Sequence, residues 1–241
     1  PGHQVQPSIW SSAAYDSNGV FVTTGNGPGG DTESVVRLNP STLAKEDSWA
    51  IPASERITDS DFGGSPTLFT ATLNGVSTPM VGACNKNGVY YALNETALAA
   101  GPVWQSNVGV PSPPHGVSEC DAAAIWNGSD LFAAGNGATI NGVAYNGDLE
   151  ELDPATGTPI WQLGLAGPPI GSPTMDGSGV IAVAEYGIGS AAHSYVVTLV
   201  NAATGAVLST FATGPEFGQP VFAGTRIFIP TENKGLIVYS G

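Results

Sequence analysis

A short motif that recurs four times constrains the fold of this chain more than any other feature. In each copy an aliphatic residue followed by Asn or Asp leads into a polar turn, and an aromatic residue follows about ten positions later. The clearest copy is Leu152-Asp153-Pro154-Ala155-Thr156-Gly157, with Trp161. A period of about 50 residues indicates a repeat architecture in which each unit packs on its neighbours. The Asn or Asp residues are Asn39, Asn94, Asp153 and Asn201, and the aromatic residues are Trp49, Trp104, Trp161 and Phe211.

A second element keeps the same period. Gly64-Ser65-Pro66-Thr67, Gly171-Ser172-Pro173-Thr174 and the related Gly218-Gln219-Pro220-Val221 each open a unit, and short apolar segments such as Val180–Ala184 lie between the two elements. Asp-Pro-Ala-Thr-Gly forms a turn because the Asp side chain bonds backbone N–H groups, Pro sets φ and Gly accepts positive φ. The chain has 33 Gly and 19 Pro but only 11% charged residues, which disfavours helices. We therefore predict that each unit contains four short strands.

A four-stranded unit of this length is typical of one blade of a β-propeller. A sandwich is the alternative all-β fold, but it does not need the same turn and aromatic residue four times. We therefore predict an all-β fold, a β-propeller of four-stranded antiparallel blades. The predicted blades lie near 8–50, 61–107, 119–164 and 168–212, with a fifth, three-stranded blade at 215–241.

Four and a half to five blades leave sheet edges open, which propellers normally avoid by closing the ring. We therefore expect the chain to be part of a seven- or eight-bladed propeller, with the missing blades supplied by a removed N-terminal segment or by another chain. The alternative is that Pro1–Gln6 completes the last blade and closes a five-bladed ring. The sequence begins at Pro1 without Met, which we interpret as a mature or trimmed product.

The net charge limits which partners the chain can bind, and the cysteines bear on its cellular compartment. The net charge is −14 with only six Lys and Arg, so the chain has no basic patch for nucleic acid or an anionic membrane surface. The apolar segments are too short to cross a membrane. Cys84 and Cys120 allow one disulfide between adjacent blades or two free buried thiols, and Asn94 and Asn127 begin glycosylation sequons. Together these features favour an extracellular or periplasmic protein.

The repeat around Asp153 resembles that of the PQQ-type β-propellers. These include the quinoprotein alcohol dehydrogenases, which use pyrroloquinoline quinone (PQQ), and an outer-membrane assembly lipoprotein built from the same blades. The resemblance covers essentially the whole chain and implies the fold. Many propellers with this repeat bind no cofactor, so an activity has to be argued from the site residues.

The first two blades resemble the dehydrogenases more specifically. Trp10 opens a Trp-x-x-x-x-Tyr-Asp segment, and Asn26 ends a strand that reads Thr-Gly-Asn. In the family, the matching Trp stacks under the quinone and the matching Asn ligates Ca²⁺. Asp61 matches the catalytic base, and Lys86 matches the Lys or Arg that contacts the quinone oxygens. The resemblance therefore implies PQQ and Ca²⁺ as cofactors, with the positive charge of Lys86 keeping Asp61 ionised.

The chain also departs from this pattern. Ser60 and Phe62 stand where the dehydrogenases have Trp and Tyr, and Gly63 stands where lanthanide-using relatives have a second Asp. The family's carboxylate ligand for Ca²⁺ and its paired cysteines would lie before Pro1. The resemblance therefore covers only the C-terminal part of such an enzyme, and we do not expect this chain alone to hold the quinone or Ca²⁺.

Each of the four site residues also has a purely structural interpretation. In the structural interpretation, Trp10 packs between blades, and Asn26 lies in a Gly-rich turn where Asn is common. Asp61 is suited to capping a turn, and Lys86 to a solvated position in a tight turn. Two functions therefore compete with an alcohol or polyol dehydrogenase. One is a non-enzymatic propeller scaffold for protein interaction, and the other is an extracellular structural glycoprotein.

Overall fold

The computed structural model describes residues 7–111, 119–187, 195–216 and 218–240. The described residues form five successive blade sheets and one inserted two-stranded sheet, and their one helix is the short 3-10 turn η1 (Leu98–Ala100). The first two sheets contain β1 (Ala14–Tyr15), β2 (Val20–Thr23), β3 (Ser34–Leu38), β4 (Lys45–Ala50), β5 (Thr67–Leu73), β6 (Val76–Cys84), β7 (Val89–Asn94) and β8 (Pro102–Asn107).

The third sheet carries an extra hairpin between its second and third strands. Its order is β14-β13-β10-β9, and β11 pairs with β12 in the inserted hairpin. These strands are β9 (Ile125–Trp126), β10 (Leu131–Gly135), β11 (Ala138–Ile140), β12 (Val143–Tyr145), β13 (Gly147–Leu152) and β14 (Pro159–Leu165). The last two sheets contain β15 (Thr174–Met175), β16 (Val180–Glu185), β17 (Val196–Asn201), β18 (Val207–Ala212), β19 (Val221–Ala223), β20 (Arg226–Thr231) and β21 (Gly235–Ser240).

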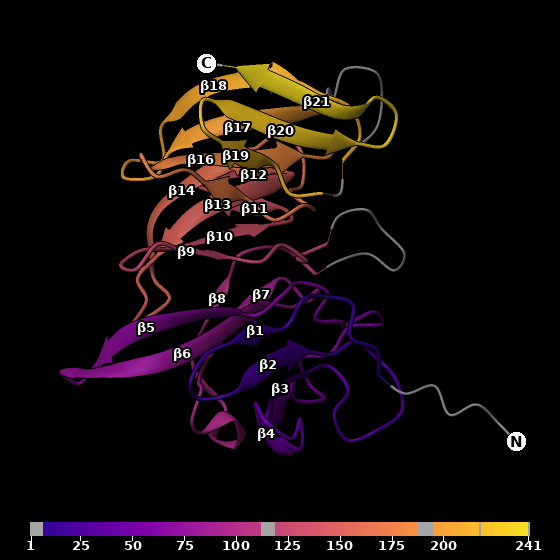
Figure 1. The fold of residues 1–241 in the computed structure, drawn as a ribbon, viewed down its shortest axis with the longest axis vertical. Coiled ribbons are helices and arrows are strands. Elements are labelled where there is room, and N and C mark those ends of the chain that lie inside the picture. The colour runs from indigo at the N-terminus through magenta and orange to yellow at the C-terminus, as the bar shows by residue number, and fades with distance from the viewer. Residues whose placement is uncertain (1–6, 112–118, 188–194, 217, 241) are drawn as a thin grey trace, which may run out of the picture.

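All pairings within the four-stranded sheets are antiparallel, and the strands pair in chain order except where the β11–β12 hairpin is inserted between β10 and β13, as in propeller blades. The predicted all-β fold with four-stranded antiparallel blades is confirmed. The fifth sheet has the three strands β19-β20-β21. The five sheets follow one another along the long axis of the molecule, from β1–β4 at one end to β19–β21 at the other (Figure 1).

The repeated aromatic residues hold neighbouring blades together. The indole Nε1 of Trp104 donates a hydrogen bond of 2.9 Å to the carbonyl of Pro154, and that of Trp161 donates one of 3.0 Å to the carbonyl of Ala202. Both acceptors lie in the repeated turn of the next blade. Gly205 in one of these turns has a φ of 68°, and a Cβ there would stand 2.7 Å from the Trp161 ring. The Gly of the motif is therefore needed both for the turn and for close contact with the aromatic ring.

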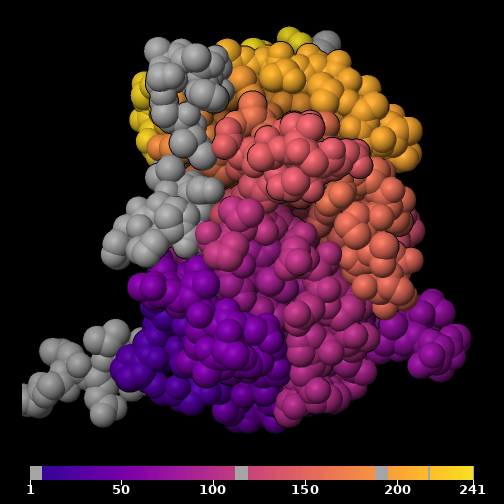
Figure 2. All heavy atoms as spheres, turned by 180° about the vertical axis from the view of Figure 1, so that it is seen from behind, coloured from indigo at the N-terminus to yellow at the C-terminus, as the bar shows by residue number. Residues whose placement is uncertain are grey.

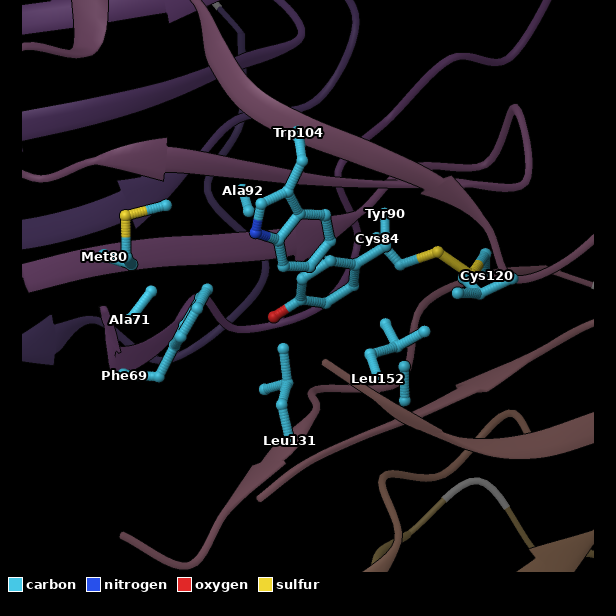
Figure 3. Close-up of a cluster of buried hydrophobic side chains, with 12 residues drawn as sticks. Phe69, Ala71, Met80, Cys84, Tyr90, Ala92, Trp104, Cys120, Leu131 and Leu152 are labelled. Carbon is cyan, nitrogen blue, oxygen red and sulfur yellow. A yellow bond between two sulfur atoms is a disulfide. The ribbon is translucent and has the colours of Figure 1, made fainter. Parts of the chain in front are cut away.

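The cysteines join the second and third blades. Cys84 at the end of β6 and Cys120 before β9 form a disulfide, and their Cα atoms are 5.7 Å apart. The bond lies at the edge of a buried cluster in which the rings of Tyr90 and Trp104 stack with centroids 5.8 Å apart (Figure 3). Disulfides persist in oxidising compartments, so this bond is typical of a protein outside the cytoplasm.

The two ends of the row of sheets lie far apart. The first and last sheets are at opposite ends in both views of the molecule (Figures 1 and 2). The described residues thus form an open arc rather than a closed five-bladed ring, and Pro1–Gln6, which the alternative prediction used to close it, lies outside them. The equivalent positions Val197 in β17 and Leu236 in β21 differ in exposure, at 0% and 62%. The outer face of the last sheet is therefore bare where the preceding sheet is covered.

Candidate functional site

The turn that carries Lys86 is fastened to the loop that carries Asp61. The Lys86 backbone N–H donates to the carbonyl of Asp61 at 3.0 Å, and the Asn85 side-chain amide donates to the carbonyl of Ser60 at 2.7 Å. Gly88 closes the turn with a φ of 87°. These backbone contacts place the two side chains beside each other at the start of the second blade.

Three carboxylates surround the Lys86 ammonium. Its Nζ lies 3.2 Å from Asp61 Oδ2, 3.3 Å from Asp59 Oδ2 and 3.2 Å from Glu119 Oε2. The side chains of Lys86 and Asp61 are only 3% and 2% exposed. Lys86 donates hydrogen bonds to Asp59 and Asp61, and Glu119 is a third ion-pair partner. Lys86 is therefore a buried ionic centre and not a solvated turn residue.

Trp10 and Asn26 reach the same centre from the first blade. The Lys86 Nζ is 4.6 Å from the centroid of the Trp10 ring, within cation–π range. The backbone N–H of Asn26 donates to Asp61 Oδ1, and its side-chain amide donates to Asp59 at 3.1 Å. Trp10 remains 53% exposed. The four residues matched to the dehydrogenases thus come together at one place, while their roles stay predictions.

The pKa values of Asp59 and Asp61 are shifted in opposite directions. Burial raises the pKa of Asp61, although the Asn26 N–H and the Lys86 ammonium both favour its ionised form. At Asp59, burial is outweighed by the hydrogen bonds with Asp61 and Lys86, and its pKa is lowered. Burial, and not the charge of Lys86 as the sequence predicts, is the largest influence on the pKa of Asp61. The result is one ionised carboxylate beside one that binds a proton more readily.

Lys86 keeps its positive charge because the carboxylates around it raise its pKa. Burial alone would lower its pKa, but the surrounding carboxylates Asp121, Glu119 and Asp61 raise it above the ordinary value. At Asp121, burial together with the neighbouring Glu119 raises the pKa to about 8. The Lys86 ammonium and the nearby carboxyl groups thus shift one another's pKa values.

An open cavity of about 530 Å³ adjoins these groups. Trp10 and Asp121 stand in its wall beside Gly63 and Gly64. A Cβ on Gly63 would collide with the Asp121 carboxylate, so Asp121, from the next blade, occupies the space of a side chain at position 63. Its Oδ1 is buried without a hydrogen-bond partner. The cavity continues towards the third and fourth blades past Ser65, Ser172 and Gln219.

Sequence reasoning missed Glu119 and Asp121. A signal for them was present, because two acidic residues flank Cys120 just before the first strand of the third blade, as Asp59 and Asp61 precede that of the second. The two sequon residues, Asn94 and Asn127, each lie in a turn in which the side-chain oxygen of the Asn accepts a backbone hydrogen bond. Their glycosylation stays a prediction.

The residues present fit a flat, polar cofactor and a cation in part. The half-exposed Trp10 ring offers a stacking surface, and the Asp121 side chain stands in the cavity wall with its Oδ1 buried and without a hydrogen-bond partner. A quinone oxygen at Lys86 would share the ammonium with the carboxylates of Asp59, Asp61 and Glu119. Within the part of the chain that the structure describes, no group of three His, Cys, Asp or Glu side chains is arranged to hold a metal ion. A cation there would need further ligands, such as the Asn26 carbonyl oxygen and cofactor oxygens.

Comparison with known proteins shows the fold. No protein-family model and no curated sequence matches the chain. A europium-containing methanol dehydrogenase superposes on 99% of the chain with a TM-score of 0.66 at 15% identity, over 52% of its own length. The quinohemoprotein alcohol dehydrogenase from Comamonas testosteroni superposes on 93% with a TM-score of 0.67 at 15% identity, over 44% of its length. The fold is that of the PQQ-type propellers.

This propeller spans about half the length of the two dehydrogenases. BamB from Moraxella catarrhalis is a weaker match, with a TM-score of 0.48 at 16% identity over 98% of the chain and 74% of BamB. The superpositions on the two dehydrogenases, at 15% identity, show the fold alone. Among the described residues, no helix is long and apolar enough to cross a membrane.

Proposed function

We propose that this chain is part of a PQQ-dependent dehydrogenase of the extracellular space or periplasm that oxidises an alcohol or polyol. The observation that carries the proposal is the convergence of Trp10, Asn26, Asp61 and Lys86 on one cavity-side cluster. These residues come from two blades and from four separate segments of the chain. Their convergence agrees with the order and residue types of the dehydrogenase pattern.

Each residue has a role suited to its surroundings. A quinone cofactor supplies the two-electron acceptor. Trp10 would bind its flat face, Lys86 would place positive charge beside its oxygens, and Asn26 would contribute an oxygen to a cation. Asp61 would take the hydroxyl proton of the alcohol. Burial raises its pKa, which makes its carboxylate a stronger base than an exposed Asp.

Dye-linked alcohol oxidation by the natively expressed protein, supplied with PQQ and CaCl₂, tests the proposal. The Asp61→Asn variant should lose activity by about 10²- to 10⁴-fold, the usual contribution of a general base, while still binding the quinone. The matched control is Asp153→Asn, which changes a turn carboxylate of the third blade. Asp61→Asn activity equal to that of the control would contradict the role of Asp61.

A propeller scaffold for protein interaction is the second candidate function. The exposed apolar side chains Leu236 and Val238 on the last sheet favour it, because large apolar patches mark docking surfaces. The two candidates make opposite predictions for the quinone. A scaffold should leave PQQ unbound in the natively expressed protein, and should instead bind its partner through the last sheet.

A further inference from the structure

Two carboxyl groups of the third sheet are buried without a positively charged partner. Asp148 and Glu150 lie on the same face of β13, because side chains two residues apart in a strand point the same way. They are 1% and 0% exposed. Among the described residues, no Lys or Arg forms an ion pair with either of them. Buried charges are normally paired or bound to a metal ion, so this pair calls for a partner.

Three of the four oxygens of this pair make no hydrogen bond. Both carboxylate oxygens of Asp148 and Oε1 of Glu150 are buried without a hydrogen-bond partner. The remaining oxygen, Oε2 of Glu150, accepts a hydrogen bond of 2.8 Å from the Gln162 side-chain amide. A carboxylic acid proton supplies a single hydrogen bond, so protonation of Asp148 would still leave buried oxygens unsatisfied. A metal ion contacts several oxygens at once.

A backbone oxygen of the second blade faces the same space. Gly135 pairs with Asp148 in the sheet, and a Cβ at Gly135 would collide with the carbonyl oxygen of Val108 and stand 3.0 Å from Asp148 Oδ1. Val108 directly follows β8, the outer strand of the second blade, and is fully buried. Its carbonyl oxygen and Asp148 Oδ1 therefore approach each other across the space that Gly135 leaves open. Two hydrogen-bond acceptors so placed are stabilised by a positive charge that contacts both.

The acidity of the pair agrees with a missing cation. Burial and repulsion from Glu150 raise the pKa of Asp148 to about 9, and the N–H of Gly135 has a smaller, opposing effect. Burial also raises the pKa of Glu150 to about 7. No positively charged side chain contributes to either shift. A cation beside both groups would favour their ionised forms and offset the cost of burying them.

We propose that Asp148, Glu150 and the carbonyl oxygen of Val108 bind one Ca²⁺ ion that joins the third blade to the second. All of these ligands are oxygens, which Ca²⁺ prefers, and two carboxylates balance its charge. Mg²⁺ fits less well, because it loses its water reluctantly and demands near-ideal octahedral geometry. The site shares no residue with the cluster around Lys86, and the inference does not depend on the proposed dehydrogenase activity.

Thermal unfolding with and without Ca²⁺ at pH 8 tests the proposal. Chelator-treated protein receives about 5 mM CaCl₂, or NaCl of equal ionic strength, and Tm is measured. We expect Ca²⁺ to raise Tm by about 4 °C or more, because an ion that binds the folded state alone stabilises it. MgCl₂ should give a smaller rise. Equal Tm values in CaCl₂ and NaCl would overturn the proposal and leave protons to neutralise the pair.

A substitution assigns the effect to this site. Glu150→Gln keeps the shape of the side chain and should abolish the rise in Tm with Ca²⁺. The matched control is Asp176→Asn, which changes a turn carboxylate of the fourth blade and should retain the rise. A rise in Glu150→Gln equal to that of the unaltered chain would place the ion elsewhere, for example at Asn26, and overturn the proposal.

Hydrogen exchange of the unaltered chain covers the case in which Glu150→Gln does not fold. Ca²⁺ should slow exchange of the β10 and β13 amides by about ten-fold or more, with a smaller effect on β20 in the last sheet, because blades open locally. Exchange of β10 and β13 that does not respond to Ca²⁺ would overturn the proposal.

Discussion

The Lys86 ammonium lies between the face of the Trp10 ring, 4.6 Å away, and the Asp61 carboxylate, 3.2 Å away. One buried cation therefore links an exposed aromatic ring of the first blade to a buried acid that precedes the second. Two further carboxylates complete the contact. The stability of this end of the propeller and its proposed chemistry depend on the same charge.

Replacing that cation should be costly. In Lys86→Met the carboxylates of Asp59, Asp61 and Glu119 lose their partner, and breaking a buried ion pair on one side costs about 3–5 kcal/mol. Urea denaturation at pH 7 measures the loss. The control is Lys45→Met, whose pair with Asp31 is exposed and should contribute about 1 kcal/mol or less. Equal effects of the two substitutions would mean that the Lys86 cluster does not stabilise the fold.

Stability should fall as the pH rises. Burial raises the pKa of Asp148 to about 9 and that of Glu150 to about 7 in the interior of the third sheet. The folded state thus binds protons that the unfolded state releases near pH 4. Their contribution is complete below that pH and is lost as the pH rises through the folded pKa values.

Thermal unfolding between pH 5.5 and pH 9 checks this dependence. We expect Tm to decrease steadily over the range, and Asp148→Asn to flatten the curve by removing the group with the highest pKa. Asp176 is the matched control, because hydrogen bonds with Val180 and Ser178 overcome burial and lower its pKa. Asp176→Asn should leave the slope unchanged in this range. A Tm that rises with pH in the unaltered chain would contradict the prediction.

The disulfide should stabilise the contact between the second and third blades. Cys84 and Cys120 are 36 residues apart in sequence, and closing a loop of this size contributes about 3–4 kcal/mol in the chain-entropy model. Guanidinium denaturation of the Cys84→Ala, Cys120→Ala double variant measures the contribution. The unaltered chain in reducing agent should show a similar loss. A denaturation midpoint that responds to neither change would show that the bond does not support the folded state.

Substitutions at equivalent positions of the last and third sheets should differ in their cost to stability, because the last sheet is open to solvent. Leu236→Ser should change the free energy of unfolding by less than about 0.5 kcal/mol, because its side chain is already exposed. Leu149→Ser, at the equivalent buried position of the third sheet, should cost more than about 2 kcal/mol. A large cost for Leu236→Ser would show that the last sheet is already covered in solution.

The fold was predictable because the repeat encodes it locally. The turn at Asp153 and the aromatic residue Trp161 specify a strand, a turn and a contact with the next blade at once, and four copies exclude a sandwich. The site was only half predictable. Asp61 and Lys86 were found through a resemblance, but Asp121 enters from a different blade, and its proximity to Gly63 is a property of blade stacking that no local pattern expresses. The pKa of Asp61 depends on how deeply the folded chain buries it, so the sequence alone suggested the wrong dominant influence.

Quinone binding to the natively expressed protein tests the central claim most directly. Equilibrium dialysis with PQQ in the presence of Ca²⁺ should show saturable binding, and Trp10→Ala should weaken it about ten-fold or more, since stacking on an aromatic ring contributes about 1 kcal/mol beyond area burial. Trp126→Ala, which removes an indole from the third blade instead, should leave the affinity unchanged. No saturable binding, or equal affinities in the unaltered protein and both variants, would contradict a quinone site at Trp10 and Lys86.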